Sequence, residues 1–298
     1  MEKYETYKIV NSNHLIKPTV YYFLKENGFS ERFISKLRTI TDSILLNNNP
    51  ANLKSKILNN DTLQIIKNPS TKTKIKLGDK NNLDIVFEDD DFLIVNKPHN
   101  LACMPSRSHY NENLGGQICA YMQEKDENFV LRIINRLDKE TAGIVVVAKN
   151  LNAYKNINNI NKEYHALCYG ILKDTYTKID KPIETLTQSG INIMKRVISN
   201  NGKPAITHVH LLKMYENLSL VKCFLETGRT HQIRVHLASI NHSLVGDNLY
   251  SPPIYLTLSA NKTNHTMLIL KKISFNHFRT NEEILLEVDY PKEWKLFI

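Results

Sequence analysis

The sequence has few features that would place the protein in a membrane or a secretory compartment. Its four cysteines, Cys103, Cys119, Cys168 and Cys223, are widely spaced and form no CxxC pair. We therefore expect small buried side chains, and neither a disulfide framework nor a zinc knuckle. The first residues, MEKYETYKIVNSNH, lack the apolar segment of a signal peptide, and no run approaches the roughly 18 apolar residues of a transmembrane helix. A soluble, cytoplasmic protein with no membrane association is expected.

Motifs for nucleotide, serine esterase and metal chemistry are also missing. The chain contains no GxxxxGK[ST] loop, no GxGxxG fingerprint and no GxSxG elbow. His231 and His236 lie five residues apart, so they do not share a helix face, and no HExxH motif or acidic third ligand accompanies them. We expect no nucleotide cofactor and no metal.

The charge balance indicates a polyanionic partner. The 298 residues include 39 Lys and Arg against 30 Asp and Glu, a net charge of +9, and the isoelectric point is about 9.2. Such an excess favours a nucleic acid as partner. The alternative is a protein whose lysines only solvate its surface, and charge alone does not decide between the two.

The first 82 residues divide into three parts. Residues 1–13 are polar and are expected to form a loose lead-in. Residues 14–67 have the elements of a miniature domain. Residues 68–82 are polar and basic, with Ile75 and Leu77 as their only large apolar side chains, and are expected to be a linker.

The miniature domain is expected to contain two helices and a small sheet. Pro18 opens a helix over residues 19–27, with Gly28 just past its end. Ser30 can cap a second helix over residues 31–39. Short apolar runs follow at residues 44–46 and 63–66.

Residues 83–298 are richer in strands than in helices. The strands do not alternate regularly with helices, which predicts an α+β fold with a large, mainly antiparallel sheet. Helical spacing of apolar residues occurs within residues 229–241. The expected strands cover residues 83–87, 92–97, 130–134, 144–147 and 163–169, two segments that flank Glu216 and Asn217, and further segments after Met267.

A charged loop between two of these strands is the first candidate for catalysis. Asp138 lies in the sequence NRLDKETAG between residues 130–134 and 144–147. A rigid sheet can hold such a side chain in a fixed position. Asp138 has a cation on either side in sequence and should be ionised at neutral pH, as a nucleophile or a base. The alternative is an ordinary charged turn.

Three further segments offer groups that can bind a phosphate or a base. The expected helix start after Gly228 presents Arg229, His231 and Gln232 as donors to a phosphate or a base, with Thr230 as its cap. Its alternative is a plain amphipathic helix. Tyr164 at a strand start is either a core or surface aromatic or a ring that stacks on a base. Lys97, in the rigid sequence NKPHN, can meet a phosphate, although that motif is weak by itself.

The order and wording of these segments resemble a known family. The chain contains DFLIVNKPHNLACMPS, NRLDKETAGIVVVAK, KEYHALCYG, GKPAITH and ETGRTHQIRVHLASINHSLVGDNLY in this order. Over residues 83–298 it closely resembles the RluA-type family of RNA pseudouridine synthases. The resemblance implies the pseudouridine synthase fold, a large mainly antiparallel mixed sheet flanked by helices and loops. It also implies that specific uridines in structured RNA are isomerised to pseudouridine without a cofactor.

The resemblance also assigns roles to individual residues. Asp138 corresponds to the family's essential aspartate, and Arg136 to the arginine that enters the RNA near the target. Tyr164 corresponds to the tyrosine packed against the target base, and Arg234 to the arginine that pairs with the aspartate. Asn135 departs from the family pattern, because a histidine usually stands there. Among the basic residues, Arg136, Lys97 and Arg229 are expected to contact phosphates of the flipped-out RNA.

Residues 14–67 more loosely resemble the small helical RNA-binding module first recognised in a ribosomal small-subunit protein. Their segment LLNNNPANLKSKI departs from the usual glycine-lysine turn of that module. An additional RNA-binding domain favours ribosomal RNA over transfer RNA as the substrate, and a monomer is the default expectation.

Two other functions remain open from the sequence. The first is a non-catalytic RNA-binding or ribosome-assembly protein on the same fold, which the departure at Asn135 favours slightly. The second is a hydrolase of N-glycosidic bonds. Such enzymes often use a second carboxylate, and only Glu140 stands close to Asp138 in sequence.

Overall fold

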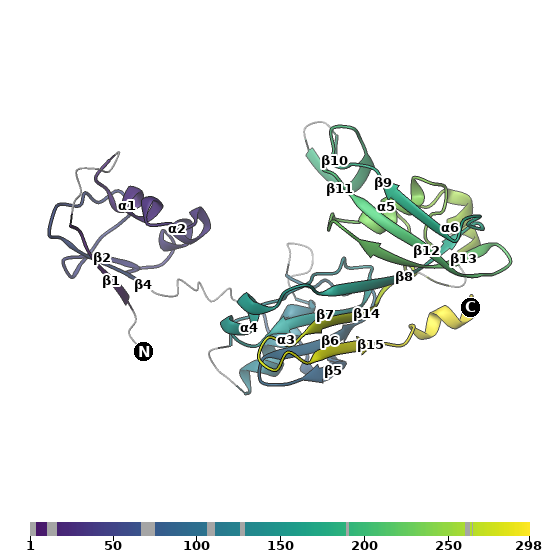
Figure 1. Cartoon of the computed structure of the whole chain (residues 1–298), viewed down its shortest axis with the longest axis horizontal. Helices are drawn as coiled ribbons and strands as arrows, with labels where there is room; N and C mark the ends of the chain where they lie inside the picture. Colours follow the sequence, from purple (N-terminus) through teal and green to yellow (C-terminus); the bar gives the residue numbers. More distant parts are fainter. Residues whose placement is uncertain are drawn as a thin grey trace. The chain divides into compact units, whose positions relative to one another are not determined.

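The computed structural model describes residues 4–10, 17–66, 75–105, 111–125, 129–188, 191–259, 263 and 265–298. The chain divides into two compact units, Met1–Lys74 and Ile75–Ile298 (Figure 1). Each unit has a hydrophobic core of its own. No helix among the described residues is long and apolar enough to cross a membrane.

The first unit contains the two predicted helices. Ser30 caps the second of them, because its Oγ accepts the N–H of Phe33 at 3.2 Å. Leu24 and Ile34 from the two helices are buried in the core of this unit. A four-stranded sheet, in the order β1-β4-β2-β3, completes it. The elements are β1 Tyr4–Lys8, α1 Val20–Glu26, α2 Glu31–Leu37, β2 Ile44–Leu46, β3 Asn49–Pro50 and β4 Thr62–Ile66.

The expected lead-in and linker need correction. Residues 4–8 are not a loose lead-in but strand β1, which pairs antiparallel with β4. The Tyr7 ring packs edge-on against Phe23 and Phe29, with centroids 5.9 and 6.0 Å apart, and this contact holds the strand in place. At the other boundary, Ile75 packs against the core of the second unit, so residues 75–82 belong to that unit. Residues 1–3, 11–16 and 67–74 lie outside the described residues.

The second unit is built on one nine-stranded sheet. Its order is β5-β6-β7-β14-β8-β13-β12-β9, with β15 added beside β14. Every pairing is antiparallel except that of β7 with β14, which confirms the predicted α+β class and mainly antiparallel sheet. Strand β8 joins the two halves of the sheet, as Figure 1 shows.

The second unit contains the predicted strands at β5, β6, β7 and β8 and the predicted helix at α5, together with elements that the sequence did not predict, among them α3, α4 and α6. The four cysteines of this unit are free and buried, as expected. The bounds are η1 Lys80–Asn82, β5 Ile85–Glu88, β6 Phe92–Lys97, α3 Leu114–Gln123, β7 Ala142–Ala148, α4 Leu151–Asn156, β8 Asn161–Tyr169, β9 Tyr176–Asp180, β10 Ile183–Gln188, β11 Ile191–Ile198, β12 Ile206–Met214, β13 Leu218–Leu225, α5 Gln232–Ala238, α6 Pro253–Ser259, β14 Leu268–Asn276, β15 Glu283–Glu287 and η2 Lys292–Leu296.

Strand β7 lies in the middle of the hydrophobic core. All seven of its residues, AGIVVVA, are buried, as expected for a central strand rich in β-branched side chains. Gly143 has φ of +111°, and a Cβ added there would lie 2.3 Å from the carbonyl oxygen of Leu270 on β14. The close parallel approach of β7 and β14 therefore requires glycine.

The predicted strand over residues 130–134 is reduced to a single bridge. Its backbone runs beside the part of β7 that β14 does not pair, where Ala148 N–H donates to Arg132 and Ile134 N–H donates to Val146. The ladder then stops, because the next two hydrogen bonds to β7 are made by a side chain, that of Asn135. A regular strand therefore does not form.

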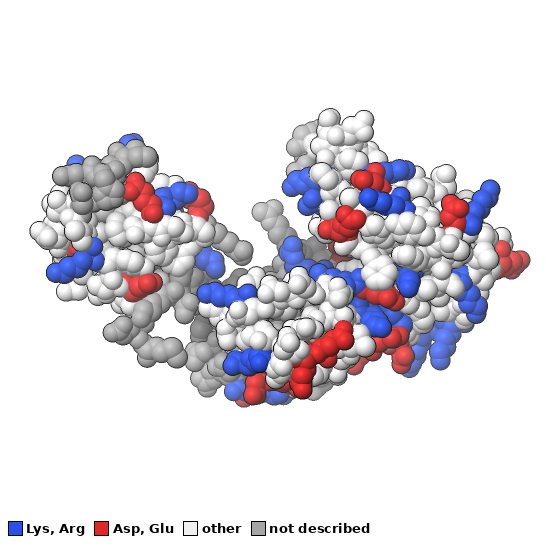
Figure 2. Space-filling model, in the orientation of Figure 1, with Lys and Arg blue, Asp and Glu red and all other residues white. Residues whose placement is uncertain are grey.

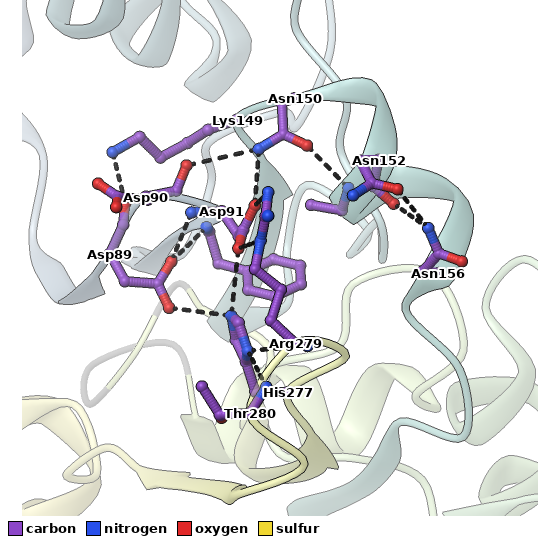
Figure 3. Close-up of polar contacts among 12 residues, drawn as sticks. Asp89, Asp90, Asp91, Lys149, Asn150, Asn152, Asn156, His277, Arg279 and Thr280 are labelled. Carbon is purple, nitrogen blue, oxygen red and sulfur yellow. Dashed lines mark hydrogen bonds and ion pairs between the residues drawn. The ribbon is translucent and has the colours of Figure 1, made fainter.

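A polar cluster ties the β5–β6 turn to the end of β14 (Figure 3). Arg279 donates to both carboxylate oxygens of Asp91, from Nε at 2.5 Å and from Nη2 at 2.9 Å. His277 Nε2 lies 3.4 Å from Asp89 Oδ2, and Asn150 Nδ2 donates to Asp91 at 2.8 Å. The cluster fixes the outer strands of this half of the sheet.

Basic and acidic side chains are interspersed on the face shown in Figure 2. The net charge of +9 is therefore not gathered into a single patch on that face. The charge by itself does not locate a binding site, which has to be found from the cavities.

Candidate active site

Asp138 lies in the wall of a cavity of about 900 Å³ in the second unit. The cavity is formed by the loop before β7, the start of β8, the end of β13 and the turn that leads into α5. Residues predicted from the sequence line it together: Arg136, Asp138, Tyr164, Arg229, Thr230, His231, Gln232 and Arg234. Lys97 is not among them.

The loop that carries Asp138 is anchored at its start by Asn135. The buried side chain of Asn135 donates from Nδ2 to the carbonyl of Ile144 at 2.9 Å. It accepts the N–H of Val146 at its Oδ1 at 2.8 Å. The amide thereby imitates one residue of a neighbouring strand. The residue that replaces the usual histidine has a structural role at the edge of β7.

The middle of the loop is held by a cysteine. Leu137 N–H donates to Cys103 Sγ at 3.3 Å, and the Cys103 thiol donates to the Leu137 carbonyl at 3.2 Å. Burial raises the pKa of Cys103, so the thiol stays protonated and can donate. Leu137, directly before Asp138, is thus fixed by both of its backbone polar groups.

Lys97 and His99 hold the part of the loop that follows Asp138. Lys97 is fully buried, and its Nζ donates to the carbonyls of Pro98, Leu101 and Lys139 at 2.8 to 3.1 Å. His99 Nδ1 donates to the carbonyl of Glu140 at 2.7 Å. The prediction that Lys97 contacts phosphate is wrong, because its ammonium is enclosed and its donors are used by backbone carbonyls. Burial lowers the pKa of Lys97 to about 8.

Arg234 is close to Asp138 but binds other carboxylates. Its Nε and Nη2 donate to the two oxygens of Asp247 at 2.7 and 2.8 Å, and its Nη1 donates to Glu140 at 3.1 Å. The predicted hydrogen-bonded pairing with Asp138 is not among these contacts, although the charge of Asp138 acts on the guanidinium. Burial opposes the charged form of Arg234, but the bonds and charges of Asp247, then Glu140 and Asp138, outweigh it and raise its pKa.

The carboxylate of Asp138 accepts a hydrogen bond from the backbone instead. His231 N–H donates to Asp138 Oδ2 at 3.3 Å. His231 has φ of +57°, in the left-handed region, and is the N-cap of α5, which begins at Gln232. The prediction that Thr230 caps this helix is wrong, because the N-cap is His231 and the helix starts one residue later than a cap at Thr230 would require.

His231 and Gln232 are buried, so they are not the open RNA donors that the sequence predicts. Gln232 accepts from Thr227 Oγ1 and from Arg229 N–H, and its Nε2 donates to Ile206 and Thr207 on β12. His231 Nδ1 is hydrogen bonded to the Tyr250 hydroxyl at 2.8 Å. Both side chains shape the turn from within.

Tyr164 reaches the cavity from β8. It is 8% exposed and lines the same cavity as Asp138. Burial, and secondly the charge of Asp138, raise the pKa of Tyr164. Its hydroxyl is therefore protonated at neutral pH, and its ring forms part of the apolar wall beside the carboxylate.

Arg136, Arg229 and Thr230 are exposed at the cavity. Arg229 Nε donates to the carbonyl of Pro204 at 3.0 Å, which leaves its other guanidinium nitrogens directed elsewhere. These three residues are the predicted RNA-binding residues that the structure leaves accessible. Among the described residues, no group of three or more His, Cys, Asp or Glu side chains could hold a metal ion.

The sequence alone did not single out Asp247, Tyr250 or Cys103 as parts of this site. Asp247 and Tyr250 lie in SLVGDNLY, a stretch within the longest motif that carries the family resemblance. Asp247 stands between Gly246 and Asn248, directly after an apolar run. This position could have indicated that Asp247 belongs to the site. Cys103 offered no such signal, because a buried cysteine is usually only a small apolar side chain.

Comparisons with known proteins show the family of the chain. Residues 91–239, which include Asp138, Tyr164 and Arg234, match the sequence profile of the family described as RNA pseudouridylate synthase. The chain is 32% identical over 269 residues to ribosomal large subunit pseudouridine synthase D of Neisseria meningitidis serogroup A, covering 84% of this chain and 70% of that protein. It is 27% identical to the uncharacterized RNA pseudouridine synthase YjbO of Bacillus subtilis, over 94% of this chain and 98% of that protein.

A solved structure shares the fold. Human RNA Pseudouridylate Synthase Domain Containing 1 matches with a TM-score of 0.58 at 24% identity, over 74% of this chain and 89% of that chain. The chain belongs to the RNA pseudouridylate synthase family, the isomerases that convert uridine in RNA to pseudouridine. The fold and activity expected from the resemblance are thereby confirmed.

Proposed function

We propose that Asp138 is the catalytic carboxylate of this isomerase. The observation that carries the proposal is its position: Asp138 lines the large cavity beside Tyr164, on a loop anchored by Asn135 and Cys103. A carboxylate there can attack the anomeric carbon of the ribose, or remove a ribose proton to form a glycal. Both routes use the same group in the same place.

The reaction needs no outside atoms or electrons. The bond between the anomeric carbon and N1 of uracil breaks, the base turns, and C5 of uracil bonds to the same carbon. The proton on C5 leaves and N1 gains one, so the product is an isomer. The sequence-based expectation of no cofactor rests on this balance.

Tyr164 and Arg234 have different relations to Asp138 in the proposal. The Tyr164 ring lies in the cavity wall, where it can stack on the detached uracil, and its protonated hydroxyl can assist the final proton transfer. Arg234 acts on Asp138 indirectly. It fixes Glu140, two residues after Asp138, and contributes a positive charge near the carboxylate.

The substrate is proposed to be ribosomal RNA. Relatives named ribosomal large subunit pseudouridine synthase D support this choice over transfer RNA. Exposed Arg136 and Arg229 at the cavity are proposed to contact its phosphates. The first unit, with its separate core, is proposed to be an additional RNA-binding domain. A cytoplasmic location and a monomeric state stay predictions.

The test is a map of pseudouridines in total RNA from cells with and without the gene. Deletion should remove pseudouridine from at least one ribosomal RNA site, and the wild-type gene should restore it. The Asp138→Asn gene should produce protein that still binds RNA but restores nothing. Restoration by Asp138→Asn would contradict the catalytic role. Loss at a transfer RNA site alone would contradict the substrate, no lost site would favour a non-catalytic RNA-binding protein, and release of free uracil would indicate a hydrolase.

A further inference from the structure

The orientation of Asp138 depends on a turn that its own loop does not contain. Its Oδ2 accepts the backbone N–H of His231 at 3.3 Å. Arg234 corresponds to the family arginine that pairs with the aspartate. Here it donates to Asp247 and Glu140. The amide of His231 is therefore the hydrogen-bond donor that the described part of the chain offers to the carboxylate.

The direction of that amide requires an unfavourable backbone conformation. His231 has φ of +57° and ψ of +19°, a left-handed conformation that only a few per cent of non-glycine residues adopt, histidine more often than most. Such conformations persist only where surrounding contacts hold them, and they are concentrated at active sites. The contacts that hold His231 should therefore matter for catalysis.

Tyr250 supplies the contact on the side chain. Its hydroxyl is 2.8 Å from His231 Nδ1 and accepts the backbone N–H of Arg196 on β11 at 2.9 Å. Its ring meets the His231 ring edge-on, with centroids 5.7 Å apart at 82°. The hydroxyl thus connects the turn before α5 to a separate strand.

Tyr250 is itself fixed to the centre of the site. Its backbone N–H donates to Asp247 Oδ1 at 3.3 Å, and the guanidinium of Arg234 lies over its ring, 5.3 Å from the centroid. Burial raises the pKa of Tyr250 and lowers the pKa of His231, so at neutral pH the pair is a protonated phenol and a neutral imidazole. Neither group brings a charge that competes with Asp138.

We propose that Tyr250 and His231 are positioning residues for the isomerisation. The Tyr250 hydroxyl holds His231 in the left-handed turn, and the amide of that turn orients Asp138 through Oδ2, which leaves Oδ1 directed to the ribose. This inference rests on the catalytic role proposed for Asp138. It assigns no contact with RNA to either side chain.

The test compares Tyr250→Phe with wild type in single-turnover and steady-state assays on RNA that contains the mapped uridine. Phenylalanine keeps the ring under Arg234 and removes only the hydroxyl. We expect kcat to fall about 10- to 100-fold, the effect typical of a small displacement of a catalytic group, while KM and RNA affinity stay near wild type. Tyr169→Phe is the matched control, because its buried hydroxyl also makes a 2.8 Å bond, to Tyr255, and it does not line the cavity.

A double-mutant cycle separates positioning from general stability. His231→Gly keeps the amide, adopts the left-handed turn without strain and lacks the ring that Tyr250 holds. Adding Tyr250→Phe to His231→Gly should lower kcat no further, and His231→Ala should be slower than His231→Gly.

Two results with the single variants would overturn the inference: a wild-type kcat in Tyr250→Phe, or the same loss in Tyr169→Phe. Additive losses in the double variant would do so as well. An inactive Asp138→Asn together with a normal Tyr250→Phe would sink this inference alone, whereas an active Asp138→Asn would sink the catalytic proposal itself.

Discussion

Arg234 holds Asp247 by two parallel hydrogen bonds, from Nε to Oδ2 at 2.7 Å and from Nη2 to Oδ1 at 2.8 Å. Both side chains are buried. Nη1 of Arg234 donates to Glu140 at 3.1 Å, on the loop of Asp138. One arginine therefore joins the α5 helix, the turn at Asp247 and the loop that carries Asp138, and its planar fork is needed for all three.

Arg234→Lys should impair catalysis severely although the charge is kept. A single ammonium cannot replace the fork that binds Asp247 and Glu140 together. We expect kcat to fall by about 100-fold or more with RNA affinity little changed, measured by single-turnover assays and filter binding. Arg279→Lys is the matched control, since Arg279 makes a similar fork to Asp91 away from the cavity. Equal losses in the two variants would refute the special role of Arg234.

Asp247→Ala should destabilise the second unit more than Asp247→Asn does. Alanine leaves the buried guanidinium of Arg234 without its main acceptor, and breaking a buried pair in this way costs about 3–5 kcal/mol. Asparagine retains one acceptor oxygen for the fork. Urea unfolding of the two variants measures the difference. If both variants unfolded with the wild-type free energy, Asp247 would not be the anchor of Arg234.

Asn135→Ala should loosen the catalytic loop. It would leave the N–H of Val146 and the carbonyl of Ile144 without partners at a buried position, which costs about 1–3 kcal/mol. Asn135→Asp keeps the acceptor for Val146 but turns a negative oxygen to the Ile144 carbonyl, so it should be at least as harmful. Thermal unfolding and faster amide exchange at Val146 would report the effect. Unchanged exchange in Asn135→Ala would argue against the strand-like role of this side chain.

The free energy of unfolding of the second unit should depend on pH through the titration of Lys97. Burial lowers the pKa of Lys97 to about 8 in the folded protein, whereas an unfolded lysine titrates near about 10.4. Between these pH values the unfolded chain binds more protons than the folded protein, so the free energy of unfolding increases as the pH rises. Below about pH 8 the ammonium is charged in both states and its burial costs stability. That cost is relieved as the pH rises through the folded pKa.

The measurement is urea unfolding of wild type and Lys97→Met from about pH 7.5 to about pH 10. Both proteins share their other titrating groups, which cancel in the difference. The wild-type free energy of unfolding should increase relative to the variant by up to about 1.4 kcal/mol per pH unit in this window. A constant difference would show that the pKa of Lys97 is not lowered.

Residues 75–298 should fold and isomerise RNA without the first unit. The two units have separate hydrophobic cores, and the cavity lining comes entirely from the second. Removing residues 1–74 should leave kcat near wild type and raise the Kd for structured ribosomal RNA. Circular dichroism establishes folding, and binding is measured over a range of salt. An unchanged Kd would contradict the RNA-binding role proposed for the first unit.

Local patterns in the sequence predicted most elements because those patterns have local causes. The helix after Ser30 formed where its cap indicates, and the apolar run of β7 became a buried central strand. The segment over residues 130–134 failed as a strand because the side chain of Asn135 made the last bonds of the ladder. Scales of strand propensity do not account for a side chain that makes the hydrogen bonds of a backbone. Strand β1 was missed because its stability comes from aromatic contacts with α1 and the turn after it.

At the site, the sequence located the residues better than their partners. Asp138, Tyr164 and Arg136, which the sequence singled out from separate segments, line one cavity. Lys97 was misassigned because a lysine in a polar motif is usually exposed, whereas here backbone carbonyls enclose it. The partner of Arg234 depends on a contact with Asp247, on a different element, and neighbouring charges in sequence do not reveal it.

The anchoring of the Asp138 loop has a consequence for substrate choice. Asn135 anchors the loop to β7, and Cys103, Lys97 and His99 hold its backbone at Leu137, Lys139 and Glu140. A loop held in this way does not bend to meet a uridine inside a stem, so the distortion falls on the RNA. Nucleotides that leave their neighbours at low energetic cost should be modified first. The enzyme would then choose among uridines in the same sequence context by how easily the surrounding RNA is deformed. Contacts with the bases do not report this property.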